Sequence, residues 1–449
     1  MSSRSDDRTT AHIFRLLRVG VAGLSMTGLV LSASAATLCV NPHGSHGCTS
    51  TIGAAVSAAS PGDVIQVWPG VYSEQVTITK SLSLIALSQH DHDAIIDATS
   101  LANGIWVDGM STAPNPGVAN VVISGFTVRN ANFEGILLTN ATNVTLVDNQ
   151  VTDNDRSLDS SSGSCPGLPA FETNEGGDCG EGIHLMGADH STILRNEVAH
   201  NAGGILTSDE TGPSDHNLIS KNFVHDNVYD CGITLASHAP AIAGAKLSFG
   251  VWYNTISRNV SLRNGTQSPG AGVGIFAPSP GTTNTGNVVI DNDILDNGAT
   301  GVAMHNHAAP PAAPPVNMND NVIVGNRFSG NGPDNPSAPT PGPTGINIFS
   351  KGQLTGTVVS QNTFDSEAID VGFSAPIGQL NVHFNNFSAG IGIDNLGAGT
   401  VDATENWWNC PFGPDKGHCA TVQGPGVSYI PWLTQPFEDE VPDRGPGFN

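Results

Sequence analysis

Basic residues are scarce in this chain. Its 449 residues include 16 Lys and Arg against 40 Asp and Glu, which gives a formal net charge of −24. A protein with this charge repels nucleic acids and anionic membranes, because both carry dense negative charge of their own. We therefore expect neither as a partner. An anionic polysaccharide would bind only with the help of bound cations or a local basic groove.

Long hydrophobic runs are also missing. Residues 19–31 form an uncharged, mostly apolar run that is too short for a comfortable membrane span. Four arginines precede it and small residues follow it at 32–36, a pattern typical of a secretory signal. We expect residues 1–36 to be a signal peptide. The mature chain would then be secreted, either extracellular, periplasmic or at the cell surface.

Cysteine pairs with zinc-site spacing are absent, and methionine is scarce. The seven cysteines contain no CxxC pair, so a structural zinc site is not expected. The six methionines are scattered, which argues against a copper-binding role. The cysteine spacing instead favours disulfides of an exported protein. The expected pairs are Cys39–Cys48, Cys165–Cys179 and Cys410–Cys419, with Cys231 left as a buried thiol.

An asparagine recurs in one short pattern, an apolar strand followed by Asn, any residue and another apolar residue. The eight instances are Asn149, Asn196, Asn222, Asn259, Asn292, Asn326, Asn362 and Asn385. A second pattern, Gly–apolar–any–apolar, alternates with it from about residue 103. Repeats of this length predict a solenoid of stacked parallel strands. We expect the Asn to form an internal ladder at a tight corner, where it tolerates a left-handed backbone.

The sequence predicts a cap at each end of the repeat. Residues 51–60 are Ala-rich and predict a short helix that covers the open first coil. Residues 405–434 contain two adjacent tryptophans and the expected Cys410–Cys419 loop, and we expect them to close the other end. Residues 435–449 are expected to be a flexible tail.

Several segments carry a family resemblance. The segment TIGAAVSAASPGDVIQVWPGVYSEQVTITKSLSLIAL resembles the first coils of bacterial β-helix-repeat proteins, and VDATENWWNCPFGP and VSYIPWL resemble their last coils. Over about residues 37–434 the chain is similar to right-handed parallel β-helix proteins of the pectin lyase-like superfamily, with repeats of the carbohydrate-binding and sugar-hydrolase type. This resemblance implies one all-β, single-stranded right-handed parallel β-helix domain. The activity stays open, because the superfamily includes lyases, hydrolases, epimerases, periplasmic accessory proteins and adhesins.

Ionisable residues gather where the predicted strands enter loops. Column members of a stack lie above one another, so residues six places after the motif glycine are expected to share one groove. At or near this column lie Asp209, Glu210, His238, His305, His307 and Lys351. An acidic segment at 172–184 adds Glu172, Glu175, Asp178, Glu181 and His184.

Two mechanisms fit these residues. A glycoside hydrolase needs two carboxyl groups beside the glycosidic bond, and stacked carboxylates raise one another's pKa, as a general acid requires. The predicted catalytic residues are Asp209, Glu210 and Asp230. The predicted substrate-binding residues are Glu181, His184, His238, His305, His307 and Lys351. A polysaccharide lyase would instead use Lys351 or a histidine as base, with Ca²⁺ held by the acidic loops.

We therefore expect a protein that binds an extracellular polysaccharide, with hydrolysis favoured over elimination because basic residues are so few. The alternative is a non-catalytic binding or structural protein of the cell surface, and a periplasmic metal-accessory protein is the third candidate. Convergence of the predicted acidic residues and histidines around one cleft would separate the enzyme from the scaffold.

Overall fold

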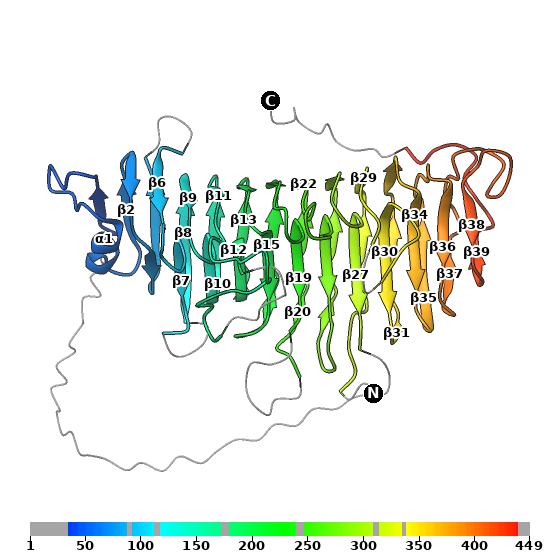
Figure 1. The fold of residues 1–449 in the computed structure, drawn as a ribbon, viewed down its shortest axis with the longest axis horizontal. Coiled ribbons are helices and arrows are strands. Elements are labelled where there is room, and N and C mark those ends of the chain that lie inside the picture. The colour runs from blue at the N-terminus through cyan, green and yellow to red at the C-terminus, as the bar shows by residue number, and fades with distance from the viewer. Residues whose placement is uncertain are drawn as a thin grey trace, which may run out of the picture. The chain divides into compact units, whose positions relative to one another are not determined.

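Parallel strands stacked coil upon coil make up the regular structure of this protein (Figure 1). The structure is a computed structural model. It describes residues 35–87, 92–111, 117–171, 179–238, 247–308, 314–334 and 338–438. Residues 1–34 of the expected signal peptide lie outside these ranges, as do Glu172, Glu175 and Asp178. The fold is the predicted right-handed parallel β-helix.

Each complete coil contributes strands to three faces. The first face consists of β4 (Val76–Ile78), β7 (Ile105–Asp108), the first half of β10 (Ile136–Val147), β12 (Glu181–Asp189), β15 (Gly203–Ser208), β19 (Ile233–Ala236), β23 (Val273–Phe276), β27 (Val302–Asn306), β30 (Thr344–Ser350), β34 (Ile369–Ser374), β36 (Ile391–Asn395) and β38 (Thr421–Gln423). Short strands at its edge toward the second face are β16 (Ser214–Asp215), β20 (Val251–Trp252), β24 (Asn284–Thr285) and β31 (Gln353–Leu354).

The second and third faces complete the coil. The second face consists of β1 (Thr37–Val40), β2 (Asp63–Val67), β5 (Leu82–Ala86), β8 (Val118–Ser124), the second half of β10, β13 (Thr192–Leu194), β17 (Leu218–Ser220), β21 (Thr255–Ser257), β25 (Val288–Ile290), β28 (Val322–Val324), β32 (Val358–Ser360), β35 (Ile377–His383), β37 (Thr400–Asp402) and β39 (Val427–Ser428). The third face consists of β3 (Gly70–Tyr72), β6 (Ala94–Asp97), β9 (Phe126–Arg129), β11 (Gln150–Thr152), β14 (Glu197–Ala199), β18 (Phe223–His225), β22 (Val260–Leu262), β26 (Asp293–Leu295), β29 (Arg327–Ser329) and β33 (Thr363–Asp365).

The first face differs from the other two in burial. Side chains alternate across a strand, so strands of the second face such as β13 and β21 bury only their inward residues. On the first face, β15 and β19 are buried at every position. Their inward residues join the apolar core, and their outward residues are covered as well. Polar side chains on this outer surface are therefore withdrawn from water.

Asparagine ladders fix the corners between the faces. The predicted ladder lies between the second and third faces: at each step the backbone N–H and the side-chain Nδ2 of one Asn donate to Oδ1 of the next, as in Asn196 to Asn222 at 2.9 and 3.0 Å. It runs from Asn149 and extends one coil further than predicted, to Asn406. Two more ladders occupy the other corners. Their members are Asn217, Asn254, Asn287 and Asn321, and Asn154, Asn201, Asn227, Asn264, Asn297 and Asn331.

The left-handed residue at each corner is not the ladder asparagine, which corrects the expectation from sequence. It is the residue immediately before it, for example Lys221 before Asn222, with a φ of 56°. The turn at that residue leaves the Asn free to point inward, where its amide bridges two coils. The outward residue can carry any side chain that tolerates the left-handed region, and His, Asp and Arg all occur there.

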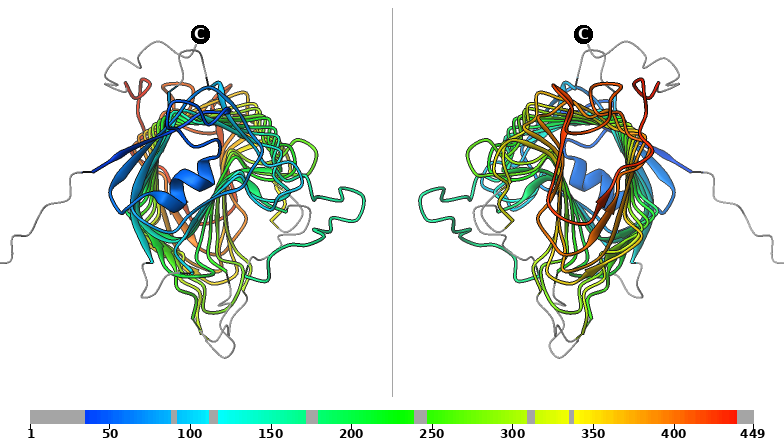
Figure 2. Two further views of the ribbon diagram at one scale, coloured as in Figure 1. Left: turned by 90° about the vertical axis from the view of Figure 1, so that its left-hand side faces the viewer. Right: turned by 90° about the vertical axis from the view of Figure 1, so that its right-hand side faces the viewer.

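Both ends of the stack are covered by packed residues. Helix α1 (Ile52–Ala58) lies at the first coils (Figure 2), and Thr51 caps its N-terminus. At the other end Trp408 is fully buried and its ring centroid lies 4.8 Å from that of Phe387. Within the expected tail, the N–H of Phe437 donates to Asn386 Oδ1 at 2.7 Å.

All three predicted disulfides form, at Cys39–Cys48, Cys165–Cys179 and Cys410–Cys419. Cys231 lies outside these pairs and is buried. Such disulfides fit an oxidising, extracytoplasmic compartment. Across the described ranges, no helix has both the length and the apolar character needed to cross a bilayer.

Candidate functional site

A chain of buried polar side chains crosses the outer surface of the first face. His184 on β12 lies at its centre: Nδ1 is 2.9 Å from Glu134 Oε1, and Nε2 is 2.7 Å from the hydroxyl of Ser208 on β15. The Ser208 hydroxyl donates in turn to Glu210. Oε1 of Glu210 forms an ion pair with Nδ1 of His238 at 3.1 Å. The chain therefore alternates carboxylates and imidazoles over four neighbouring coils.

Glu181 stands beside the same histidine. Its Oε2 lies 3.7 Å from His184 Nδ1, and its backbone N–H donates to Glu134 Oε2 at 2.6 Å. One atom each from Glu134, Glu181 and His184 lie within 4.8 Å of one another. Two carboxylates and one imidazole are suitable ligands for a divalent cation. Glu181 and His184 come from the predicted acidic segment 172–184, and together with Glu134 they form one group among the described residues that could hold such an ion.

The strand register explains why these residues meet. β10 pairs with β12 so that Ile136 stands opposite Ile183, and β12 pairs with β15 so that Met186 stands opposite Ser208. Glu134 and Glu181 therefore occupy one column, each immediately before a motif glycine. Glu134 and Ser208 were missed from the sequence, although the repeated Glu-Gly dipeptide at 134–135 and 181–182 carries a visible signal for the first.

Asp209, a predicted catalytic residue, is hydrogen-bonded to residues of the next coil. Its Oδ1 accepts the backbone N–H of His238 at 2.7 Å, and its Oδ2 accepts the N–H of Gly250 at 2.5 Å and the hydroxyl of Ser237 at 3.0 Å. Burial raises the pKa of Asp209, against these hydrogen bonds. The carboxylate is placed to shape the loop that carries His238.

Glu210 behaves differently from the sequence-based expectation. Burial alone would raise its pKa, but attraction to His238 and His184 outweighs burial and holds the pKa of Glu210 well below its ordinary value. The expected mutual elevation of stacked carboxylates is therefore wrong at this residue, because imidazoles alternate with the carboxylates. An ionised Glu210 is suited to positioning histidines and not to donating a proton.

The remaining predicted residues lie elsewhere along the face. Asp230 precedes β19, at the opposite end of that strand from His238, and its backbone N–H donates to Ala202. The predicted column thus brings Glu210 and His238 together and leaves Asp230 at the other edge of the face.

A second polar cluster lies three coils further along. The register runs from Ser208 through Ala236 and Phe276 to His305, a rise of ~14 Å at ~4.8 Å per coil. His305 Nε2 lies 2.9 Å from Asp334 Oδ2, which also accepts the side chain of Asn347.

His307 joins this second cluster through its ring, whose centroid is 5.4 Å from that of His305 and 5.1 Å from that of Phe349. Burial, aided by repulsion from His305 and Lys351, lowers the pKa of His307 to about 4. The predicted groove therefore divides into two clusters on one face.

A cavity opens where the third face meets the first. Its volume is about 420 Å³, and Asp155, Arg156, Asp226, Tyr229 and Gln267 line it among others. Burial, then repulsion from Glu134, raises the pKa of Asp155 to about 9. Its Oδ1 is buried and has no hydrogen-bond partner among the described residues. This carboxyl was not predicted, since nothing in the sequence separates it from the acidic residues of the neighbouring loop.

Asp226 lines the same cavity, but its pKa is displaced in the opposite direction. It accepts two hydrogen bonds from Arg263, at 2.7 and 2.6 Å, and one from His225 at 2.7 Å. The hydrogen bond from Arg263 is the largest cause that lowers the pKa of Asp226, to about 2. One cavity is thus lined by a carboxyl that is protonated near neutral pH and by another that is ionised.

Comparisons with known proteins support the fold. A family model described as "Right handed beta helix region" matches residues 98–249. A search of curated protein sequences gave no significant match. Among solved structures, the Dettilon tailspike protein is 14% identical with a TM-score of 0.52, over 83% of this chain and 63% of that chain.

Two further structures are similar at lower scores. The A-module of mannuronan C-5 epimerase AlgE4 from Azotobacter vinelandii is 12% identical with a TM-score of 0.49, over 84% of this chain and 94% of that chain. The ORF18 protein of Geobacillus virus E2 is 12% identical with a TM-score of 0.48, over 78% of this chain and 58% of that chain. At these identities the similarity concerns the fold alone.

Proposed function

We propose that this protein binds an extracellular polysaccharide across its first face and hydrolyses a glycosidic bond in the cavity beside Asp155. The observation that carries the proposal is the pair of carboxyl groups, Asp155 and Asp226, that line one cavity with pKa values displaced in opposite directions. Glycoside hydrolysis uses one protonated and one ionised carboxyl group. Asp155 is the proposed acid, and Asp226 is the proposed base or nucleophile.

The cavity has the chemistry of a sugar subsite. About 420 Å³ is within the range of small-ligand sites, and the lining combines Arg156, Tyr229 and Gln267 with the two carboxyl groups. Sugars present many hydroxyls that both donate and accept, so such mixed polar linings recognise them by hydrogen bonds.

The buried polar chain on the first face affects the pKa of Asp155 through Glu134. Burial is the largest cause that raises the pKa of Asp155, and repulsion from Glu134 adds to it. Glu134 is itself hydrogen-bonded to His184. We assign Glu181, His184, Glu210 and His238 to this supporting chain and Asp209 to the loop beside it. In this proposal Asp230 contacts substrate between the cavity and the face, and His305, His307 and Lys351 form a more distant contact for an extended polymer.

The test is hydrolysis of a panel of neutral and anionic polysaccharides, read by the release of reducing ends and by the absorbance of unsaturated products. Hydrolysis produces the first signal without the second. Asp155→Asn should lower the rate by ~10²–10⁴-fold, as expected when a general acid is lost. Asp153→Asn is the matched control, because Asp153 is also left-handed and lies two residues away. Unsaturated products, or full activity in Asp155→Asn, would contradict the assignment.

Binding without cleavage is the second candidate. The deep burial of Glu134 and Glu210 favours it, because a buried polar chain also serves to make one face of a scaffold rigid. In that case polysaccharide would bind to the wild-type protein with no new reducing ends, and Asp155→Asn would change affinity alone.

A further inference from the structure

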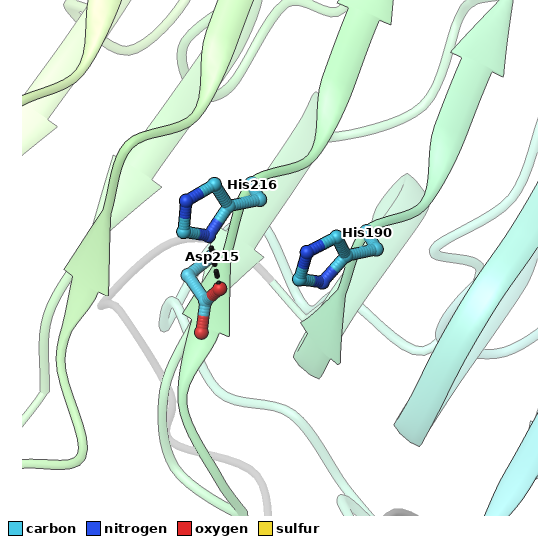
Figure 3. Close-up of side chains that lie close together, drawn as sticks. All are labelled: His190, Asp215 and His216. Carbon is cyan, nitrogen blue, oxygen red and sulfur yellow. Dashed lines mark hydrogen bonds and ion pairs between the residues drawn. The ribbon is translucent and has the colours of Figure 1, made fainter. Parts of the chain in front are cut away.

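Two Asp-His dipeptides stand side by side on the surface, away from the cavity. They are Asp189-His190 and Asp215-His216, and Asp189 and Asp215 are register partners on successive coils. Each histidine is the left-handed residue at the corner between the first and second faces, with φ values of 51° and 53°. This conformation turns both imidazoles outward, and they lie side by side (Figure 3).

The rings are close and nearly parallel. Their centroids are 5.0 Å apart, with 13° between the planes. Nδ1 of His190 lies 2.9 Å from Asp189 Oδ2, and Nδ1 of His216 lies 2.5 Å from Asp215 Oδ1. About half or more of each histidine side chain is exposed, so both can be reached from solvent.

We propose that His190, His216 and Asp215 form a binding site for a divalent transition-metal ion such as Zn²⁺ or Cu²⁺. One atom from each of the three residues lies within 4.8 Å of the others. Rotation of exposed side chains would bring them to the ~2.0–2.2 Å bonds of such an ion. Two imidazoles and a carboxylate select these metals over Ca²⁺ or Mg²⁺, which prefer oxygen ligands alone.

The surroundings of the cluster favour a cation. A histidine that binds a metal usually hydrogen-bonds a carboxylate through its other nitrogen, which fixes the ring and makes it a better ligand. Asp189 is placed for this role at His190, and it is itself held by the hydroxyl of Thr142 at 2.6 Å. Asp189 and Asp215 together also balance the charge of a divalent ion.

The site is confined to two coils. The same corner position is Asn143 on the coil before, and Tyr253 on the coil after, whose ring centroid lies 5.4 Å from that of His216. One site of this kind is therefore expected at this corner of the stack. Because three protein ligands leave a coordination position open, a water or an external group can complete the shell.

The test is calorimetric titration of the untagged, chelator-treated full chain with Zn²⁺. We expect one saturable site. His190→Asn and His216→Asn should each weaken binding by more than tenfold, and Asp189→Asn by ~10–100-fold, as expected for a residue that orients a ligand. Asparagine tolerates the left-handed backbone. His46→Asn is the matched control, since His46 is an exposed histidine with a φ of 56° outside the cluster.

Electron paramagnetic resonance with Cu²⁺ counts the ligands directly. Two imidazole nitrogens are expected in the wild-type spectrum and one in His190→Asn. The proposal is overturned if the wild-type protein binds no more tightly than the double variant His190→Asn/His216→Asn. It is also overturned if His184→Gln, which disrupts the trio on the first face, removes the titrated site while the double variant retains it.

Discussion

His184 Nδ1 lies 2.9 Å from Glu134 Oε1, although the two residues are 50 positions apart in the chain. One turn of the solenoid brings them together, across the insertion that holds the Cys165–Cys179 disulfide. The contact is buried on both sides. It links the cavity, through Asp155, to the polar chain that continues to Glu210.

Replacement of Glu134 by glutamine should destabilise the protein by ~3–5 kcal/mol, because removal of one partner leaves buried polar and charged groups uncompensated. The free energy of unfolding in urea measures the effect. Glu405→Gln is the control, since Glu405 is exposed at a corner, and it should change that free energy by less than ~0.5 kcal/mol. Equal effects of the two changes would show that the buried contact adds nothing.

Asn222→Ala should cost at least ~3 kcal/mol of unfolding free energy. The substitution leaves the backbone N–H of Asn196 without its acceptor and removes the hydrogen bonds from Asn222 Nδ2 to Ile193 and Asn259. Each buried unsatisfied group costs ~1–3 kcal/mol. Asn381→Ala is the comparison, because Asn381 points outward from β35. Urea unfolding measures the free energy of unfolding of both variants. Equal losses in the two variants would show that the ladder does not stabilise the stack.

Asp155 should make stability fall as pH rises. Its folded-state pKa is raised to about 9, so between the ordinary Asp value and about pH 9 the folded state binds more protons than the unfolded state, and the unfolding free energy decreases with pH. The contribution is at most ~1.4 kcal/mol per pH unit. Urea unfolding from about pH 6 to about pH 8 should show a shallower decline in Asp155→Asn. A parallel decline in both proteins would exclude a protonated Asp155.

Glu367 ends one ladder in place of an asparagine. Its Oε1 accepts the backbone and side-chain N–H groups of Asn331 at 3.3 and 3.0 Å, and burial raises the pKa of Glu367 to about 7. Its stabilising contribution is therefore present at low pH and lost as the pH rises through about 7. Glu367→Gln keeps the acceptor without the charge.

The Glu367→Gln protein should be more stable than the wild type by ~1–3 kcal/mol at about pH 8, and nearly equal to it at about pH 5. Thermal unfolding at the two pH values, with Glu405→Gln as the exposed comparison, measures this difference. A gain that is the same at both pH values would contradict ionisation as its cause.

The repeat made the fold predictable from sequence. Asn149 to Asn385 are spaced irregularly, yet each follows an apolar strand, and only a coil with loops of different length satisfies both facts. The two other ladders were not predicted. Asn217 follows polar residues in place of an apolar strand, and Asn154 is followed two places later by Arg156 in place of an apolar residue.

The candidate site was only partly visible. The column rule correctly paired Glu210 with His238, because strand register carries that information. The rule compared only residues that follow the motif glycine. Glu134 precedes its glycine and was therefore missed. The pKa of Asp155 depends on burial by residues distant in sequence. Only the folded structure shows this burial.

The corner ladders also bear on how such a chain can change in length. Each coil is joined to its neighbours through the same few amide contacts, whether 23 residues or 47 separate the two asparagines. A duplicated or deleted turn would meet an identical surface above and below, so whole coils can be gained or lost without redesign of the interior. Point insertions belong in the loops that border the first face. Variation in size and variation in ligand would then proceed separately in descendants of this chain.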